Sequence, residues 1–152
     1  MTWRESLEGF IRAQAPSAER VEIVRVMGMP AGASNETVSL DLEVECDGVV
    51  FVLPVVLRPQ REAGILAPYD VGRQFRVMRA LSRTDVPVPA VFWQDEGEEV
   101  LGRPFFLMER VAGETLPLFW YGGQSPSTRA AATALASIHG VDWRAAGLGF
   151  LA

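Results

Sequence analysis

The feature that most constrains the fold of this chain is a pair of apolar segments joined by Asp47-Gly48. Residues 37–45 alternate apolar and polar side chains, which is the period of a β-strand with one buried side. Glycine reaches positive φ without a Cβ clash, so Asp47-Gly48 predicts a tight hairpin, with residues 49–58 as the return strand. Pro54 removes a donor from that strand, which predicts an edge position or a bulge there.

Helical and strand patterns surround this hairpin. Residues 3–14 carry apolar side chains at helical spacing, from Trp3 to Gln14, and Thr2 with Glu5 matches a capping box. Asp70 is the expected N-cap of a second helix. The remaining expected elements are a helix over residues 71–81, strands over residues 21–26, 91–93 and 103–111, and a last helix from Ser125-Pro126 to about His139.

The order of these elements predicts an α+β fold. It is helix, three strands, helix, two strands and helix, which indicates a mostly antiparallel five-stranded sheet with one inserted helix. The composition changes after Gly113. We therefore expect two units, a small lobe over residues 1–113 and the beginning of a helical lobe over residues 114–152.

Composition and charge exclude several classes of function. The chain has 152 residues and a net charge of −5, and its 14 Lys and Arg residues form no basic cluster, so we expect no nucleic-acid partner. Cys46 is the only cysteine, which excludes an internal disulfide and fits a reducing, cytoplasmic location. The N-terminal residues lack the apolar stretch of a signal peptide, and the longest apolar run is too short to span a membrane.

The loop between the first two strands has two interpretations. Its residues Gly32, Ala33, Ser34 and Asn35 suit an ordinary hairpin turn. They also suit a phosphate site, because Gly32 permits close backbone approach and successive N–H groups can cradle phosphate oxygens.

Several segments in this order resemble one known family. They are GASNET, VVLRP, YDVGRQFRVMRAL, VPVPAVFW, LGRPFFLMERVAG and LASIHGVDW. Together they resemble the small lobe of the protein-kinase-like fold, and more closely the aminoglycoside phosphotransferase and choline kinase group. The resemblance implies that the chain binds ATP, that the intact enzyme uses Mg²⁺, and that the acceptor is a hydroxyl of a small molecule.

The resemblance also assigns roles at the phosphate end of the site. The loop with Ser34 would cover the phosphates, Arg58 would bind the α- and β-phosphates, and Val56 would form part of the roof over adenine. Without the resemblance, the favoured interpretation of Arg58 is a charge at a strand end that extends to solvent. Gln74 takes the place of the helix Glu that orients the phosphate-binding cation in kinases. It can accept a hydrogen bond from Arg58 but cannot form an ion pair.

The MERVAG segment matches the hinge between the lobes. The resemblance places Met108 behind the adenine pocket, and the Glu109 carbonyl and Val111 N–H against the base. The alternative is a strand that runs into a glycine turn. Outside the resemblance, the free backbone groups of a strand edge can bind a flat heterocycle whatever the side chains.

The groups that perform phosphoryl transfer are missing from the sequence. The family's HGDxxxxN-type loop and its later Asp-containing metal motif have no counterpart, since the chain has one histidine, His139, and one asparagine, Asn35. We interpret His139 as a structural residue that closes a helix, and Asp142 as a capping residue. No catalytic or metal-binding residue is therefore assigned, and we expect the chain alone to be inactive.

Three hypotheses follow. The first is the ATP-binding small lobe of a small-molecule phosphotransferase. The second is a non-catalytic kinase-like module that binds a nucleotide or a protein, and the third is a structural domain without a nucleotide site. An exposed apolar face could also support self-association; its expected residues are Leu116, Leu118, Phe119, Trp120, Leu135 and Ile138.

Overall fold

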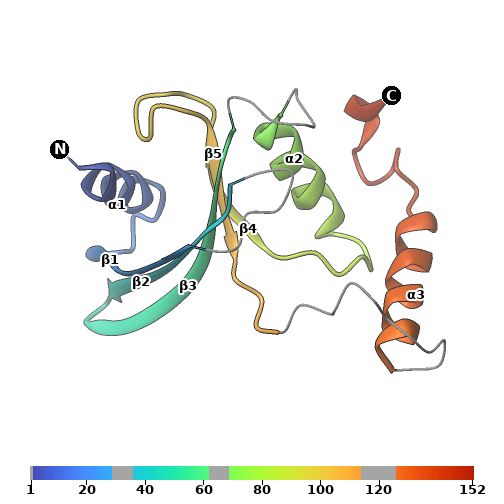
Figure 1. Ribbon diagram of the computed structural model, residues 1–152, viewed down its shortest axis with the longest axis horizontal. Helices are drawn as coiled ribbons and strands as arrows, with labels where there is room; N and C mark the ends of the chain where they lie inside the picture. Colours follow the sequence, from blue (N-terminus) through green and yellow to red (C-terminus); the bar gives the residue numbers. More distant parts are fainter. Residues whose placement is uncertain (1, 29–35, 62–68, 114–125) are drawn as a thin grey trace.

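The computed structural model describes residues 2–28, 36–61, 69–113 and 126–152 (Figure 1). In chain order the elements are α1 (Trp3–Gln14), β1 (Arg20–Gly28), β2 (Val38–Cys46), β3 (Val49–Pro59), α2 (Val71–Leu81), β4 (Val91–Asp95), β5 (Phe105–Glu109), α3 (Pro126–His139) and a 3-10 turn, η1 (Gly149–Leu151). The expected order of helices and strands is confirmed, while η1 was not predicted.

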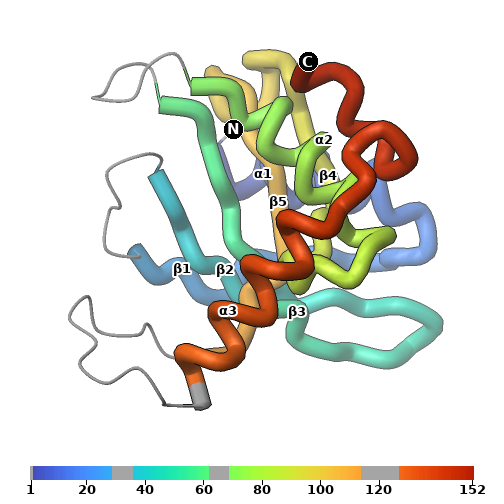
Figure 2. The backbone as a smooth tube through the Cα atoms, turned by 90° about the vertical axis from the view of Figure 1, so that its right-hand side faces the viewer, coloured from blue at the N-terminus to red at the C-terminus, as the bar shows by residue number. Residues whose placement is uncertain are grey.

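The strands form one antiparallel sheet in the order β1-β2-β3-β5-β4. Helix α2 connects β3 to β4, so it is the inserted helix, and the predicted α+β class is confirmed. Figures 1 and 2 both place α3 on the same side of the sheet as α2, with α1 on the opposite side.

The β2–β3 hairpin is the longest ladder in the sheet. Its turn residues Asp47 and Gly48 have φ values of 51° and 71°, as a two-residue hairpin turn requires. The register then runs without a shift from Cys46 opposite Val49 to Val38 opposite Leu57.

The expectation of an edge position at Pro54 is confirmed for that stretch of the strand, whereas the alternative, a bulge, is absent. Strand β3 as a whole is interior, and its register with β2 is regular at Pro54. The physical reason for the edge position is the length of β5, whose pairing with β3 ends at Val55 opposite Glu109. Pro54 is the next residue, and its carbonyl accepts a bond of 3.3 Å from Arg110 N–H. The proline therefore stands where β5 leaves the sheet and no regular ladder donor is needed.

Two expectations need correction. Strand β5 spans Phe105–Glu109 rather than residues 103–111, because Pro104 has no N–H and β4 ends its pairing at Val91. The apolar face of α1 is also narrower than expected. Its capping box is present, but Trp3 is 43% exposed, and Gln14 is exposed as well.

Each face of the sheet packs against one helix. On the α1 face, Leu7 and Ile11 are buried against Leu40, Val55 and Leu107. On the α2 face, a smaller cluster joins α2 to β5, through Val71, Phe75 and Phe106. The rings of Phe75 and Phe106 meet edge-to-face with centroids 5.9 Å apart.

Helix α3 shows part of the expected apolar face. Leu135 and Ile138 are about half exposed, at 52% and 50%. The other four predicted members of that face lie outside the described residues. Among the helices that the structure describes, none has the length and apolar character needed to cross a membrane.

A matched pair of substitutions in β3 tests this arrangement. Val55 is fully buried on the α1 face, whereas Val52 is 56% exposed. We expect Val55→Ala to lower the free energy of unfolding by about 2 kcal/mol, from lost burial and a cavity. Val52→Ala should change it by less than about 0.5 kcal/mol. Urea denaturation measures both, and equal effects would contradict the assignment of the two faces.

Candidate functional site

Arg58 lies near the end of β3, with its side chain on the α2 face. Neighbouring residues of a strand point to opposite faces, so Val56 and Arg58 share this face while Val55 and Leu57 belong to the core on the other. Phe106 of β5 lies opposite Arg58 in the register. The guanidinium is therefore carried to the boundary between the sheet and α2.

Gln74 is brought to Arg58 by the packing of α2. Asp70 caps the helix, as predicted, since its Oδ1 accepts a bond of 2.7 Å from Arg73 N–H. Phe75 anchors the first turns of the helix to the sheet. Arg58 Nη2 consequently lies 3.5 Å from Gln74 Oε1, which is a long hydrogen bond.

The electrostatic state of Arg58 is unusual for a surface arginine. Its Nε is buried and has no hydrogen-bond partner in the described part of the chain. Among the described residues, no carboxylate lies within ion-pair distance of its guanidinium. Burial lowers the pKa of Arg58, yet arginine remains protonated in proteins. A half-buried cation with an unfilled donor is suited to an anionic ligand.

A hollow of about 370 Å³ adjoins this cation. Its walls are mainly apolar, and Arg73 gives it a second guanidinium. Neither Arg73 nor Phe106 was predicted as a site residue. Both lie within the family segments, but the resemblance assigned them no role, and only the packing of α2 on β5 brings them together. The lining residues are Arg58, Arg73, Gln74, Val77, Met78, Pro89, Phe106 and Met108.

The predicted phosphate loop, residues 32–35, lies outside the described residues. The strands that lead into and out of it are described, and they locate its base. Gly28 pairs with Val38, and Val38 pairs with Leu57. With strands roughly 5 Å apart, Gly28 and Val38, the last paired residues on either side of the loop, lie within about 10 Å of the Leu57 backbone.

Two of the predicted hinge residues, Met108 and Glu109, form the end of β5, and Val111 follows the strand. Met108 lies opposite Val56, which is buried at 4% exposure. Glu109 is bound to the residue before β4, since its N–H donates to the Ala90 carbonyl at 2.8 Å and its Oε2 accepts from Ala90 N–H at 3.1 Å. Val111 is 59% exposed. Among the described residues, its N–H donates to no backbone carbonyl.

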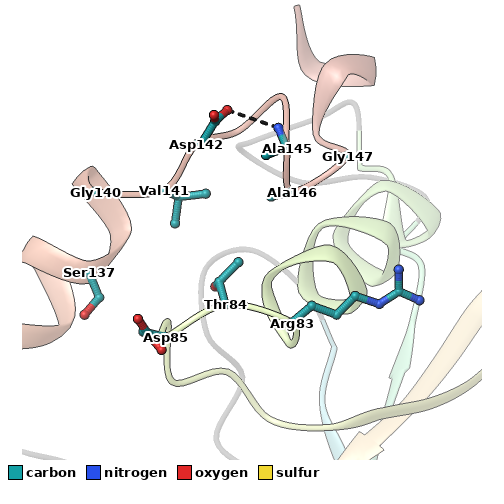
Figure 3. Close-up of a pocket in the computed structure, with 10 residues that line it drawn as sticks. All are labelled: Arg83, Thr84, Asp85, Ser137, Gly140, Val141, Asp142, Ala145, Ala146 and Gly147. Atoms are coloured by element: carbon teal, nitrogen blue, oxygen red, sulfur yellow. Dashed lines mark hydrogen bonds between the residues drawn. The ribbon is translucent and has the colours of Figure 1, made fainter.

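A second, larger hollow lies elsewhere, between the loop after α2 and the segment after α3 (Figure 3). Its volume is about 600 Å³, and Thr84, Asp85 and Ser137 contribute polar groups. Asp142 Oδ1 accepts bonds of 3.0 Å from Arg144 N–H and from the following N–H, so this carboxylate caps its own turn as predicted. The cation that lines this hollow, Arg83, is exposed, and its side chain points away from the other lining residues (Figure 3), so it differs from the half-buried Arg58.

No metal centre is formed by the part of the chain that the structure describes. It contains no group of three or more His, Cys, Asp or Glu side chains that could hold an ion. His139 is the last residue of α3, which is the position expected for it.

Comparison with known proteins indicates a phosphotransferase, which agrees with a site suited to an anionic ligand. A solved structure of a putative aminoglycoside phosphotransferase from Ralstonia eutropha is 32% identical, with a TM-score of 0.61 over 95% of this chain and 40% of that chain. This likeness supports both the fold and a phosphotransferase relationship.

Longer proteins also contain a similar segment. Acyl-CoA dehydrogenase family member 11 of Rattus norvegicus is 28% identical over 94% of this chain, which is 18% of that protein. Acyl-CoA dehydrogenase family member 10 of Mus musculus is 37% identical over 62% of this chain and 9% of its own length. The chain thus spans less than a fifth of the length of these relatives. Most of each relative, including the part to which its name can refer, lies outside the matched segment.

The family model described as the phosphotransferase enzyme family matches residues 26–151. That range covers most of the chain and includes β2 to β5, α2 and α3. The chain therefore belongs to the phosphotransferase enzyme family.

Proposed function

We propose that this chain is the ATP-binding small lobe of a small-molecule phosphotransferase, which moves the γ-phosphate of ATP to a hydroxyl. The observation that carries the proposal is Arg58. It combines a half-buried charge, an Nε without a partner among the described residues, and a position beside the base of the 29–35 loop. A guanidinium offers a planar pair of donors to phosphate oxygens.

The nucleotide would extend from Arg58 toward the hinge. In the proposed arrangement, residues 32–35 cover the phosphates, Val56 and Met108 contact the adenine, and backbone groups of Glu109 and Val111 bind its edge. The exposure of Val111 supports this direction. Phosphoryl transfer is mostly positioning and charge stabilisation, so the small lobe would contribute orientation of the phosphates.

Transfer itself would require groups outside this chain's sequence. Mg²⁺ would be held by oxygen ligands of a large lobe, and a carboxylate there would orient the acceptor hydroxyl. We therefore propose that residues 1–113 form the small lobe, that residues 114–152 begin the large lobe, and that the intact enzyme works in the cytoplasm. Self-association through the half-exposed apolar side chains of α3 is part of the same proposal.

Gln74 supports a second candidate, a kinase-like module that binds a nucleotide without transferring phosphate. The neutral amide meets Arg58 only at 3.5 Å. A carboxylate there would form an ion pair, which anchors the phosphate-binding cation in active kinases. The two candidates share the nucleotide site and differ in whether the intact protein turns over.

Substitution of Arg58 tests the nucleotide site. We expect Arg58→Ala to raise the dissociation constant for ATP about tenfold or more, because a charge-assisted contact to phosphate is lost. Arg79→Ala, on an exposed position of the same part of the chain, is the control and should leave ATP affinity unchanged. Isothermal titration calorimetry of the 152-residue chain measures both. Absence of ATP binding at millimolar concentration in the unsubstituted chain would refute the proposal.

Substitution of Gln74 separates the two candidate functions. Gln74→Glu should place a carboxylate beside Arg58 and raise the melting temperature by about 2–4 °C, the shift that corresponds to about 1 kcal/mol in a domain of this size. If the protein is a phosphotransferase, the intact enzyme should also transfer phosphate at least as fast in this variant. Phosphate transfer by neither form of the intact protein, together with ATP binding by both, would favour the non-catalytic module.

A further inference from the structure

Arg110 connects the end of β5 to β2 by reaching across β3. Its backbone N–H donates to the Pro54 carbonyl at 3.3 Å, which binds the chain to β3. Its side chain continues to β2, where Nη1 lies 2.7 Å from Ser39 Oγ and 2.7 Å from Asp41 Oδ1. One residue thus contacts two successive strands of the sheet, neither of which pairs with β4.

The register places these contacts on the α2 face beside the proposed adenine site. Ser39 lies opposite Val56, and Asp41 lies opposite Pro54. Val56 and Pro54 differ by two residues and therefore share a face, which is also the face of Arg58. The guanidinium of Arg110 consequently lies over β2 next to Val56, and not on the core side of the sheet.

The burial of the three side chains makes the contact stronger than a surface ion pair. Ser39 is 3% exposed and is the one buried polar residue in the described part of the chain. The Asp41 side chain is 14% exposed and that of Arg110 is 29% exposed. Ser39 Oγ receives the hydrogen bond, while Asp41 Oδ1 is buried, meets Arg110 only as a charge and has no aligned donor among the described residues. Removal of Arg110 would leave that carboxylate buried and uncompensated.

The end of β5 is also attached to the residue that precedes β4. Glu109 makes two hydrogen bonds to Ala90, at 2.8 and 3.1 Å. Two consecutive residues are therefore fixed in opposite directions, Glu109 toward β4 and Arg110 toward β2. The next residue, Val111, is exposed and leaves the sheet. Its position relative to Val56 depends on these two attachments.

We propose that Arg110, Ser39 and Asp41 form a clamp that sets the position of the hinge backbone under Val56, so that Arg110 is a positioning residue for recognition of the nucleobase. The inference rests on the proposed nucleotide site. It assigns the clamp to the base end of the nucleotide, whereas Arg58 acts at the phosphate end. The two ends can be measured separately with ligands that contain only one of them.

The test uses the intact protein and three probes, ATP, adenosine and inorganic tripolyphosphate. Arg110→Ala should raise the dissociation constants for ATP and adenosine about tenfold and change that for tripolyphosphate less than about twofold. Arg58→Ala should weaken ATP and tripolyphosphate and spare adenosine. Arg110→Lys, which keeps the charge but loses the planar fork, should restore part of the adenosine affinity.

A matched control is available on the same face of the sheet. Arg20 also joins neighbouring strands through ion pairs, to Glu43 and Glu45, but at the opposite end of the β2–β3 ladder. Arg20→Ala should leave all three dissociation constants unchanged. A double-mutant cycle of Arg110→Ala with Asp41→Asn should show coupling in adenosine affinity, since each change breaks the same contact.

The outcomes separate the clamp from the proposed function. If Arg110→Ala lowers only the melting temperature, or weakens tripolyphosphate as much as adenosine, the clamp has no role at the base end and the inference is wrong. If the unsubstituted protein binds none of the three probes, the nucleotide site itself fails. In that case hydrogen exchange at the backbone amide of residue 110, which donates to the Pro54 carbonyl, decides whether the clamp exists. Unchanged exchange in Arg110→Ala would overturn it too, and faster exchange would retain it as a structural contact alone.

Discussion

The alternation of side chains along β3 is the constraint on which both the core and the candidate site depend. Val55 and Leu57 are buried on the α1 face, while Val56 and Arg58 point to the α2 face. A shift of one residue in the β2–β3 register would exchange the two sets. It would place a guanidinium in the core and remove it from α2. The unshifted ladder that follows the Asp47-Gly48 turn therefore determines the position of the site.

Local features of the fold could be predicted because their causes are local. The α1 capping box, the Asp70 cap and the hairpin turn each depend on side chains within a few residues, and all three are present. The end of β5 could not be predicted in this way. It depends on where β3 and β4 stop pairing with it, which is a property of the assembled sheet. The edge position of Pro54 could be predicted, because the missing N–H of proline is a local cause, whereas its place within an otherwise interior strand could not.

The residues of the candidate site divide in the same way, into those that the sequence predicted and those that depend on the assembled sheet. Arg58 and Gln74 were identified together because the spacing of the family motifs relates them, and the structure brings them within 3.5 Å. Arg73, Phe106 and Arg110 lie within the family segments, but the resemblance assigns them no role. Ser39 and Arg110 are separated by 71 residues, and they meet only because β2 and β5 flank the same strand. The side-chain pattern within one helix or strand gives no information on contacts between residues so far apart in the sequence.

Pro54 has a consequence for the addition of a further strand to the sheet. Residues 49–53 of β3 pair with β2 alone in the described structure, and four of them expose apolar side chains. Such an edge is open to strand addition by another chain. The Pro54 carbonyl already faces Arg110, so the backbone groups on the open side belong to Val50 and Val52. A foreign strand that paired there would meet a position without a donor after only two residues, and it could not extend along β3 toward Arg58. Pro54 and β5, which pairs with β3 from Val55 onward, therefore confine strand addition to residues 49–53.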